Sequence, residues 1–93
     1  MRTEHLKNIS NKQLAKDLAA LIRWIPKERL DISFMEKIQG LIDNVLLEIE
    51  FRVRSKWFLP HIVRNIDFLK NSNDFEESLK ILHETEKLIN SEI

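Results

Sequence analysis

Apolar side chains recur along this chain at intervals of three and four residues, the period that places them on one face of an α-helix. In the first such stretch, from about Thr3 to Ile25, these positions are Leu14, Leu18, Leu21, Ile22 and Ile25. Ser10 with Gln13 three residues later fits a capping box, so we expect a helix to begin near Ser10. Pro26 is expected to end it, because proline lacks a backbone N–H and disfavours helical geometry in the preceding residue.

The second stretch predicts the longest helix, from about Phe34 to Phe58, with Ser33 and Glu36 as its capping pair. Its main apolar face holds Phe34, Met35, Ile38, Leu41, Ile42, Val45, Leu46, Ile49 and Val53. Gly40 lies within this run, where an exposed glycine costs about 1 kcal/mol relative to alanine. We therefore expect a neighbouring helix to approach closely at Gly40.

Two further stretches complete the pattern. Pro60 is expected to end or kink the second helix, and apolar residues then recur from His61 to Lys70. The run 71–74 is the clearest turn, and Asp74 with Glu77 is expected to cap a last helix over 75–90. Its expected inner stripe is Phe75, Leu79, Leu82, Leu88 and Ile89, widened by Ile81.

The pattern as a whole predicts one all-α domain over residues 1–93. Its expected architecture is a small antiparallel helical bundle with a long second helix and a break at Pro60. The bundle has four helices if the chain breaks fully at Pro60, and three if the chain only kinks there.

Composition removes several classes of function. The chain has 93 residues, one glycine and no cysteine, so it offers no Gly-rich phosphate loop, disulfide or thiolate site. Its three histidines are far apart, and neither HExxH nor the ExxH spacing of di-iron bundles occurs, so we expect no metal and no cofactor. With no signal peptide and no apolar run of about 20 residues, we expect a cytoplasmic protein without membrane contacts.

The formal net charge of zero conceals blocks of alternating sign. Residues 1–16 sum to +3, residues 17–50 to −3, residues 51–66 to +4 and residues 67–93 to −4. The block 51–66 contains no acid. One interpretation is that this block packs beside acidic residues of the last helix, in the same chain or in a second copy. The candidate acids are Asp74, Glu76, Glu77 and Glu84.

A second apolar side is predicted on the long helix. At 100° per residue, Leu47, Phe51 and Phe58 lie roughly opposite its main apolar face. A helix that is apolar on two sides is usually buried on two sides. Either the other helices of the chain or a second copy can cover this side, so monomer and homodimer both stay open.

The preferred functional hypothesis is a non-enzymatic protein-interaction module: a small regulator, inhibitor or assembly subunit that acts through its helical surface. It needs no catalytic residues and no small-molecule substrate. Aromatic side chains supply much of the energy of an interface, and basic ones steer an acidic partner. The expected partner-binding residues are Phe51, Arg52, Arg54, Lys56, Trp57 and Phe58.

Two alternatives use the same region. Basic residues with interleaved aromatics can also bind nucleic acid, here through Lys12, Lys16, Arg52, Arg54, Lys56 and Arg64. The third hypothesis rests on Arg54 and His61, which are separated by six residues. This spacing resembles the R-x(4–6)-H element of the helical HEPN-type ribonucleases, which implies RNA cleavage by the pair at a dimer interface. The chain departs from the family in its short length and in Pro60, which directly precedes the histidine.

Overall fold

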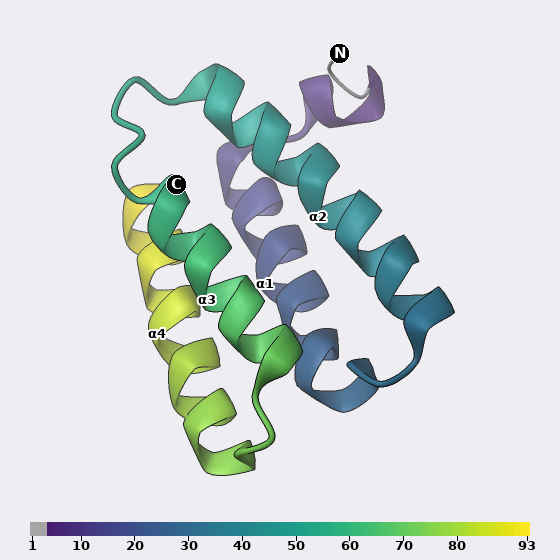
Figure 1. The fold of residues 1–93 in the computed structure, drawn as a ribbon. Helices are drawn as coiled ribbons and strands as arrows, with labels where there is room; N and C mark the ends of the chain where they lie inside the picture. Colours follow the sequence, from purple (N-terminus) through teal and green to yellow (C-terminus); the bar gives the residue numbers. More distant parts are fainter. Residues whose placement is uncertain (1–3) are drawn as a thin grey trace.

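The computed structural model describes residues 4–93, and in that part of the chain every regular element is a helix, which confirms the predicted all-α bundle. The predicted start at Thr3 lies outside the described residues. The elements along the chain are a 3-10 helix, η1 (Glu4–Asn8), followed by α1 (Asn11–Glu28), α2 (Ile32–Arg52), α3 (Leu59–Asn71) and α4 (Phe75–Glu92). Consecutive α-helices run in opposite directions, and α1 lies between α2 and the α3–α4 pair (Figure 1).

The core is one cluster of buried apolar side chains from η1 and all of the α-helices. The central helix α1 contributes the fully buried residues Leu14, Leu18, Ile22 and Ile25. It packs against α2, α3 and α4, whereas α2 makes few contacts with α3 or α4. The bundle is therefore open on the side between α2 and α3.

The inner face of α4 is more polar than its predicted stripe. Its buried residues are Ser78, Thr85 and Ile89. The Thr85 hydroxyl donates to the Ile81 carbonyl (2.7 Å) and accepts from Nδ2 of Asn65 in α3 (2.9 Å), so it is satisfied inside the bundle. The prediction that Phe75 and Leu79 point inward is wrong. Both are exposed, because α4 turns its Ser78–Thr85 side to its neighbours instead.

Side-chain caps set the start of α1 and α4 as predicted. The hydroxyl of Ser10 accepts from the backbone N–H of Gln13 at 3.1 Å. The carboxylate of Asp74 accepts from the backbone N–H of Glu77, also at 3.1 Å. Each bond satisfies one of the backbone donors that a helix leaves free in its first turn.

The cap of α2 differs from the prediction. Asp31 is the N-cap, and its carboxylate accepts from the Phe34 N–H at 3.0 Å, whereas Ser33 lies inside the helix. We expect Asp31→Ala to lower the free energy of unfolding by about 1 kcal/mol, and Ser33→Ala to change it by less than about 0.5 kcal/mol. Urea unfolding measures both. A larger loss from Ser33→Ala would contradict the assignment.

Neither proline ends a helix. Pro26 lies inside the last turn of α1, which continues to Glu28, so the missing N–H removes only one hydrogen bond near the helix end. Pro60 lies in the first turn of α3, where the missing donor would have no helical partner anyway. The break between α2 and α3 comes earlier, because α2 ends at Arg52 rather than at Phe58. Four α-helices result, not three.

The expectation of a helix packed on Gly40 is also wrong. A Cβ built on Gly40 would meet nothing within 4 Å. The residue is exposed on α2, so no contact within the described chain explains its presence there.

Candidate interaction surface at the α2–α3 connection

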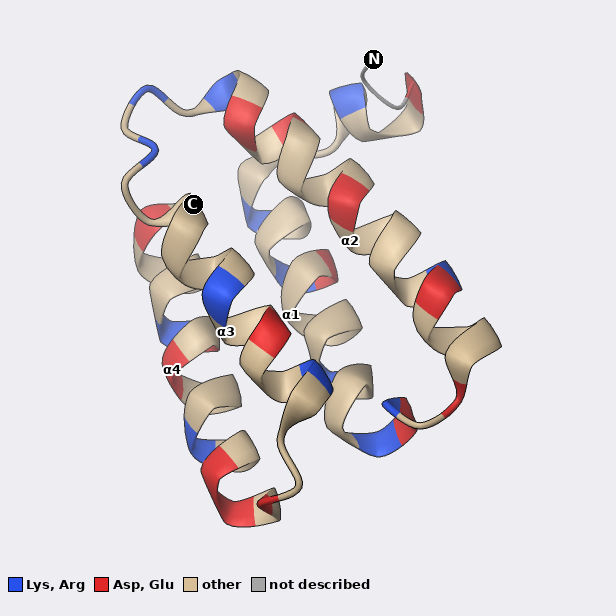
Figure 2. Cartoon of the chain, in the orientation of Figure 1, with Lys and Arg blue, Asp and Glu red and all other residues tan. Residues whose placement is uncertain are grey.

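The acid-free block 51–66 forms the end of α2, the irregular connection 53–58 and the first half of α3. Figure 2 shows blue segments and no red along the connection. Trp57 lies in the connection with 55% of its surface exposed. Its ring meets the rings of Phe58 and His61 edge to face, with centroid distances of 6.3 and 5.7 Å. The exposed indole is thus held against the start of α3.

Phe58 is not part of this surface. Only 1% of it is exposed, and it belongs to the core cluster. The prediction that Phe58 is a partner-binding anchor is therefore wrong. Helical geometry continued from α2 would point Phe58 away from the core. The connection reverses this, because ending α2 at Arg52 lets the ring turn inward.

Arg52 is likewise bound within the fold, with only 18% of its side chain exposed. Its Nε donates to Oε2 of Glu48 at 2.8 Å, and that carboxylate is fully buried. Nη1 donates to Oδ1 of Asn11 at 2.9 Å. Nη2 donates to the backbone carbonyls of Leu6 at 2.7 Å and Lys7 at 3.2 Å. The guanidinium joins η1, α1 and α2, so it is committed to the fold rather than to a protein or nucleic-acid partner.

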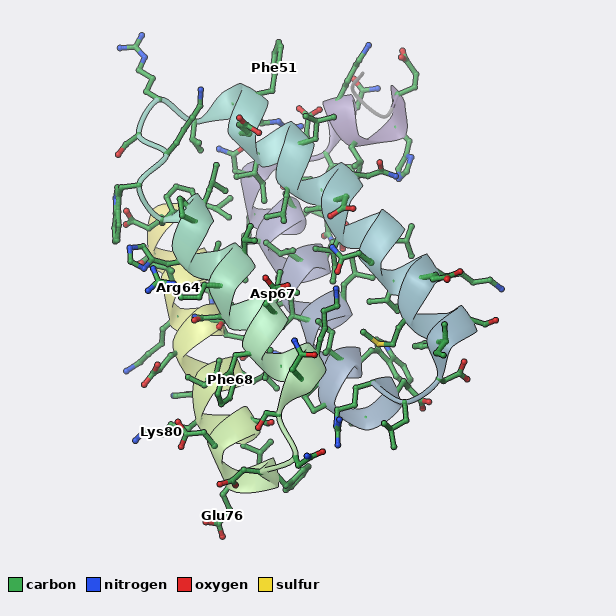
Figure 3. The ribbon with its side chains drawn as sticks, viewed as in Figure 1. Phe51, Arg64, Asp67, Phe68, Glu76 and Lys80 are labelled. Carbon is green, nitrogen blue, oxygen red and sulfur yellow. The ribbon has the colours of Figure 1, made fainter. Side chains whose placement is uncertain are left out.

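The remaining predicted residues stay on the surface. Phe51 is 65% exposed and points away from the bundle at the end of α2 (Figure 3), while Arg54 and Lys56 are exposed in the connection. Leu47, on the same predicted second apolar side, is also exposed. Whether a second copy covers them stays a prediction.

His61 connects Trp57 to the basic side chain of Arg64. His61 was not among the predicted partner-binding residues, yet its ring contacts Trp57, and its Nδ1 lies 3.0 Å from Nη2 of Arg64. Arg64 and Lys56 both line a hollow of about 530 Å³ beside the start of α3. We name Arg54, Lys56, Trp57, His61 and Arg64 the connection surface. The spacing of Trp57 and His61, four residues apart at a helix start, is the signal that could have identified the histidine.

The part of the block on α3 packs against α4, as Asn65 does against Thr85, but no ion pair among residues 4–93 joins the block to the candidate acids of α4. Pairing with these acids in a second copy stays a prediction. Instead, Glu86 of α4 accepts from Nε of Arg23 in α1 at 2.5 Å. That hydrogen bond and the negative charge of Glu86 raise the pKa of Arg23.

Lys12 and Lys16, the other predicted nucleic-acid contacts, lie on α1. Both are exposed and four residues apart, so they share one side of that helix. Among the described residues, no hydrogen bond connects them to the connection surface.

Residues 4–93 contain no group of three or more His, Cys, Asp or Glu side chains placed to hold a metal. None of their helices combines the length and hydropathy needed to cross a membrane. His61 contacts Trp57 and Arg64, and no described hydrogen bond joins it to Arg54, so cleavage of RNA by that pair stays a prediction.

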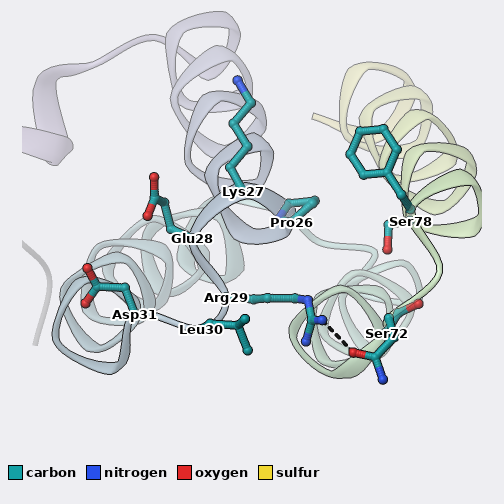
Figure 4. Close-up of a pocket in the computed structure, with 10 residues that line it drawn as sticks. Pro26, Lys27, Glu28, Arg29, Leu30, Asp31, Ser72 and Ser78 are labelled. Carbon is teal, nitrogen blue, oxygen red and sulfur yellow. Dashed lines mark hydrogen bonds between the residues drawn. The ribbon is translucent and has the colours of Figure 1, made fainter.

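A second hollow, of about 580 Å³, opens where the α1–α2 and α3–α4 turns meet (Figure 4). Across it, Nη2 of Arg29 donates to Oδ1 of Asn73 at 2.5 Å. Its rim carries two basic residues, Lys27 and Arg29, and two acidic ones, Glu28 and Asp31. The hollow therefore favours neither an anionic nor a cationic ligand. This hollow offers no distinct ligand chemistry.

In comparisons with known proteins, no protein-family model, curated protein or solved structure matches this chain.

Proposed function

We propose that this chain is a non-enzymatic interaction module that binds an acidic face of a partner protein through the connection surface. The observation that carries the proposal is Trp57, a large aromatic side chain that is 55% exposed within a block of the sequence that has four basic residues and no acid. Water-exposed indole surface is costly unless a partner covers it, and tryptophan is among the residues most enriched at interface hot spots.

The neighbouring charges fit the same partner. Arg54, Lys56 and Arg64 are exposed, so they attract an approaching acidic surface over about one Debye length, roughly 8 Å at physiological salt. Trp57 then supplies the buried contact. The edge-to-face packing on Phe58 and His61 restrains the indole before binding, which lowers the entropy that association costs.

The test uses two tryptophans in the same chain. Trp57→Ala is expected to remove a co-purifying partner, with a loss of affinity of at least about tenfold, because hot-spot truncations cost about 2 kcal/mol or more. Trp24→Ala is the matched control, because Trp24 is 46% exposed but lies on α1 against Phe34 and Lys27. Affinity capture with the full chain, followed by cross-linking through Lys56, measures both.

Three results would contradict the proposal: capture that survives Trp57→Ala, capture that is lost equally with Trp24→Ala, or cross-links that avoid Lys56. Raising the salt concentration should slow association more than it speeds dissociation, because exposed charges act mainly on the association rate.

Nucleic-acid binding is a second candidate, supported by the exposed indole beside basic side chains. With Arg52 committed to the fold, its candidate contacts are Lys12, Lys16, Arg54, Lys56 and Arg64. It predicts an affinity for single-stranded RNA or DNA that falls steeply as salt rises. An anisotropy titration with a labelled oligonucleotide that shows no binding at low salt would end this alternative.

A further inference from the structure

A small cleft opens between α1 and α2, which pack side by side, and η1 packs against α2 beside it (Figure 1). Its volume is about 290 Å³. The residues that line it are Asp17, Ala20, Leu21 and Trp24 of α1, Leu41, Asn44 and Val45 of α2, and His5 and Leu6 of η1. Those on each α-helix are three or four positions apart, so they belong to one side of that helix. We call this feature the α1–α2 cleft.

The wall of the α1–α2 cleft is apolar except at His5, Asp17 and Asn44. Trp24 on one helix is 46% exposed and Leu41 on the other is 50% exposed. A ligand in the cleft would therefore remove apolar surface of both helices from water. The volume lies just below the usual range of small-molecule sites, about 300–1,000 Å³, so only a compact ligand fits.

The negative charge in the cleft wall comes from the carboxylate of Asp17. This side chain is half-buried, and its Oδ1 accepts a hydrogen bond from Nε2 of Gln13 at 2.8 Å. No ion pair among residues 4–93 involves Asp17, and no lysine or arginine lines the cleft. The other titratable group in the wall is the imidazole of His5, and histidine is uncharged at about pH 8. The complement of this wall is a cation.

Trp24 gives the same wall an aromatic ring that already attracts an ammonium group. Nζ of Lys27, which does not line the cleft, lies 5.6 Å from the centroid of the Trp24 ring, within the range of a cation–π contact. The ring also meets Phe34 edge to face, with a centroid distance of 5.8 Å, which restrains it. A carboxylate and a restrained indole therefore lie seven residues apart on one side of α1.

From the apolar walls, the carboxylate and the indole, we propose that the α1–α2 cleft binds a small aromatic amine in its protonated form. The ammonium group donates to the carboxylate of Asp17, a charge-assisted hydrogen bond. The ring of the ligand covers Trp24 and Leu41. An anionic ligand of the same shape would be repelled by Asp17. The proposal is independent of the function assigned to the connection surface, with which the cleft shares no residue.

The test uses the full chain at about pH 8 and three probes of similar shape: phenethylammonium, phenethyl alcohol and phenylacetate. Two-dimensional NMR follows the indole N–H resonances of the two tryptophans, which Trp57→Phe assigns. Trp24 reports on the cleft, and Trp57 is the control within the same molecule because it lies on the connection surface.

Phenethylammonium is expected to shift the Trp24 resonance with a dissociation constant of about 1 mM or lower and to leave Trp57 unchanged. Phenethyl alcohol should bind about fivefold more weakly, because it has the ring but not the charge that pairs with Asp17. Phenylacetate should give no saturable shift.

Asp17→Asn removes the charge and keeps the oxygen that accepts from Gln13, so the fold should be retained. It is expected to weaken phenethylammonium binding about fivefold and to leave the alcohol unaffected. Asp43→Asn is the matched control, because Asp43 also accepts from a glutamine four residues earlier, Gln39, at 2.7 Å, and does not line the cleft. Leu41→Ala should weaken the amine and the alcohol alike, because it removes apolar wall.

Four outcomes would overturn the proposal. They are no saturable shift of Trp24 with phenethylammonium, equal or tighter binding of the alcohol or of phenylacetate, equal losses from Asp17→Asn and Asp43→Asn, and a shift of Trp57 in place of Trp24.

Discussion

Replacing Phe58 with alanine is expected to lower the free energy of unfolding by about 3–5 kcal/mol. The ring is 1% exposed and is part of the core cluster. Its removal loses the transfer free energy of an aromatic side chain and leaves a cavity between α3 and its neighbours. For a domain of this size such a loss is a large fraction of the total stability. Urea unfolding followed by circular dichroism measures it.

The control for Phe58 is the adjacent tryptophan. Trp57→Ala removes a larger side chain, but one that is 55% exposed, so we expect it to cost much less stability than Phe58→Ala. If Phe58→Ala unfolds the chain at room temperature, Phe58→Leu is expected to retain the fold with an intermediate loss. Equal losses from Trp57→Ala and Phe58→Ala would show that Phe58 does not lie in the core.

Replacing Arg52 with alanine has the second largest expected effect, a loss of about 3 kcal/mol or more in the free energy of unfolding. The variant removes an ion-pair partner of Glu48, a fully buried carboxylate 2.8 Å away. It also removes the donors to the carbonyls of Leu6 and Lys7. Losing four hydrogen bonds, one of them charge-assisted to a buried carboxylate, costs far more than removing an exposed charge, because the acceptors left behind are held away from water.

Arg54→Ala is the matched control for Arg52, because it removes the same charge two residues further along, from an exposed position. Its expected effect is within about 0.5 kcal/mol. Amide exchange adds a local readout: Arg52→Ala should increase exchange in η1, whose carbonyls the guanidinium binds, whereas Arg54→Ala should not. Similar unfolding midpoints for the two variants would contradict the role assigned to Arg52.

These two residues show why partner-binding residues are difficult to choose from a sequence. Phe58 and Arg52 both belong to the basic and aromatic block 51–66, and from the sequence they were assigned to the same partner-binding surface as Trp57 and Arg54. The structure separates them by burial and by hydrogen bonding. A loop conformation that turns Phe58 inward leaves Trp57 outside, and the carbonyls of η1 come within reach of Arg52 only when the helices pack.

The local pattern by itself determined the all-α class, the order of the helices, the turn before the last helix (72–74 in the structure, 71–74 as predicted) and the caps at Ser10 and Asp74. Each of these depends on residues a few positions apart, because helix periodicity and capping are short-range properties. It also determined that block 51–66 carries positive charge without acids.

Only the tertiary structure decided which of the apolar and charged side chains are covered. The end of α2 at Arg52, the inward turn of Phe58 and the open space at Gly40 all depend on where other helices lie. A periodic pattern reports the side of a helix that is apolar, but it carries no information on whether a neighbour is present there. Burial is set by contacts between segments far apart in the chain, and for this protein those contacts bury Phe58 and leave Trp57 exposed.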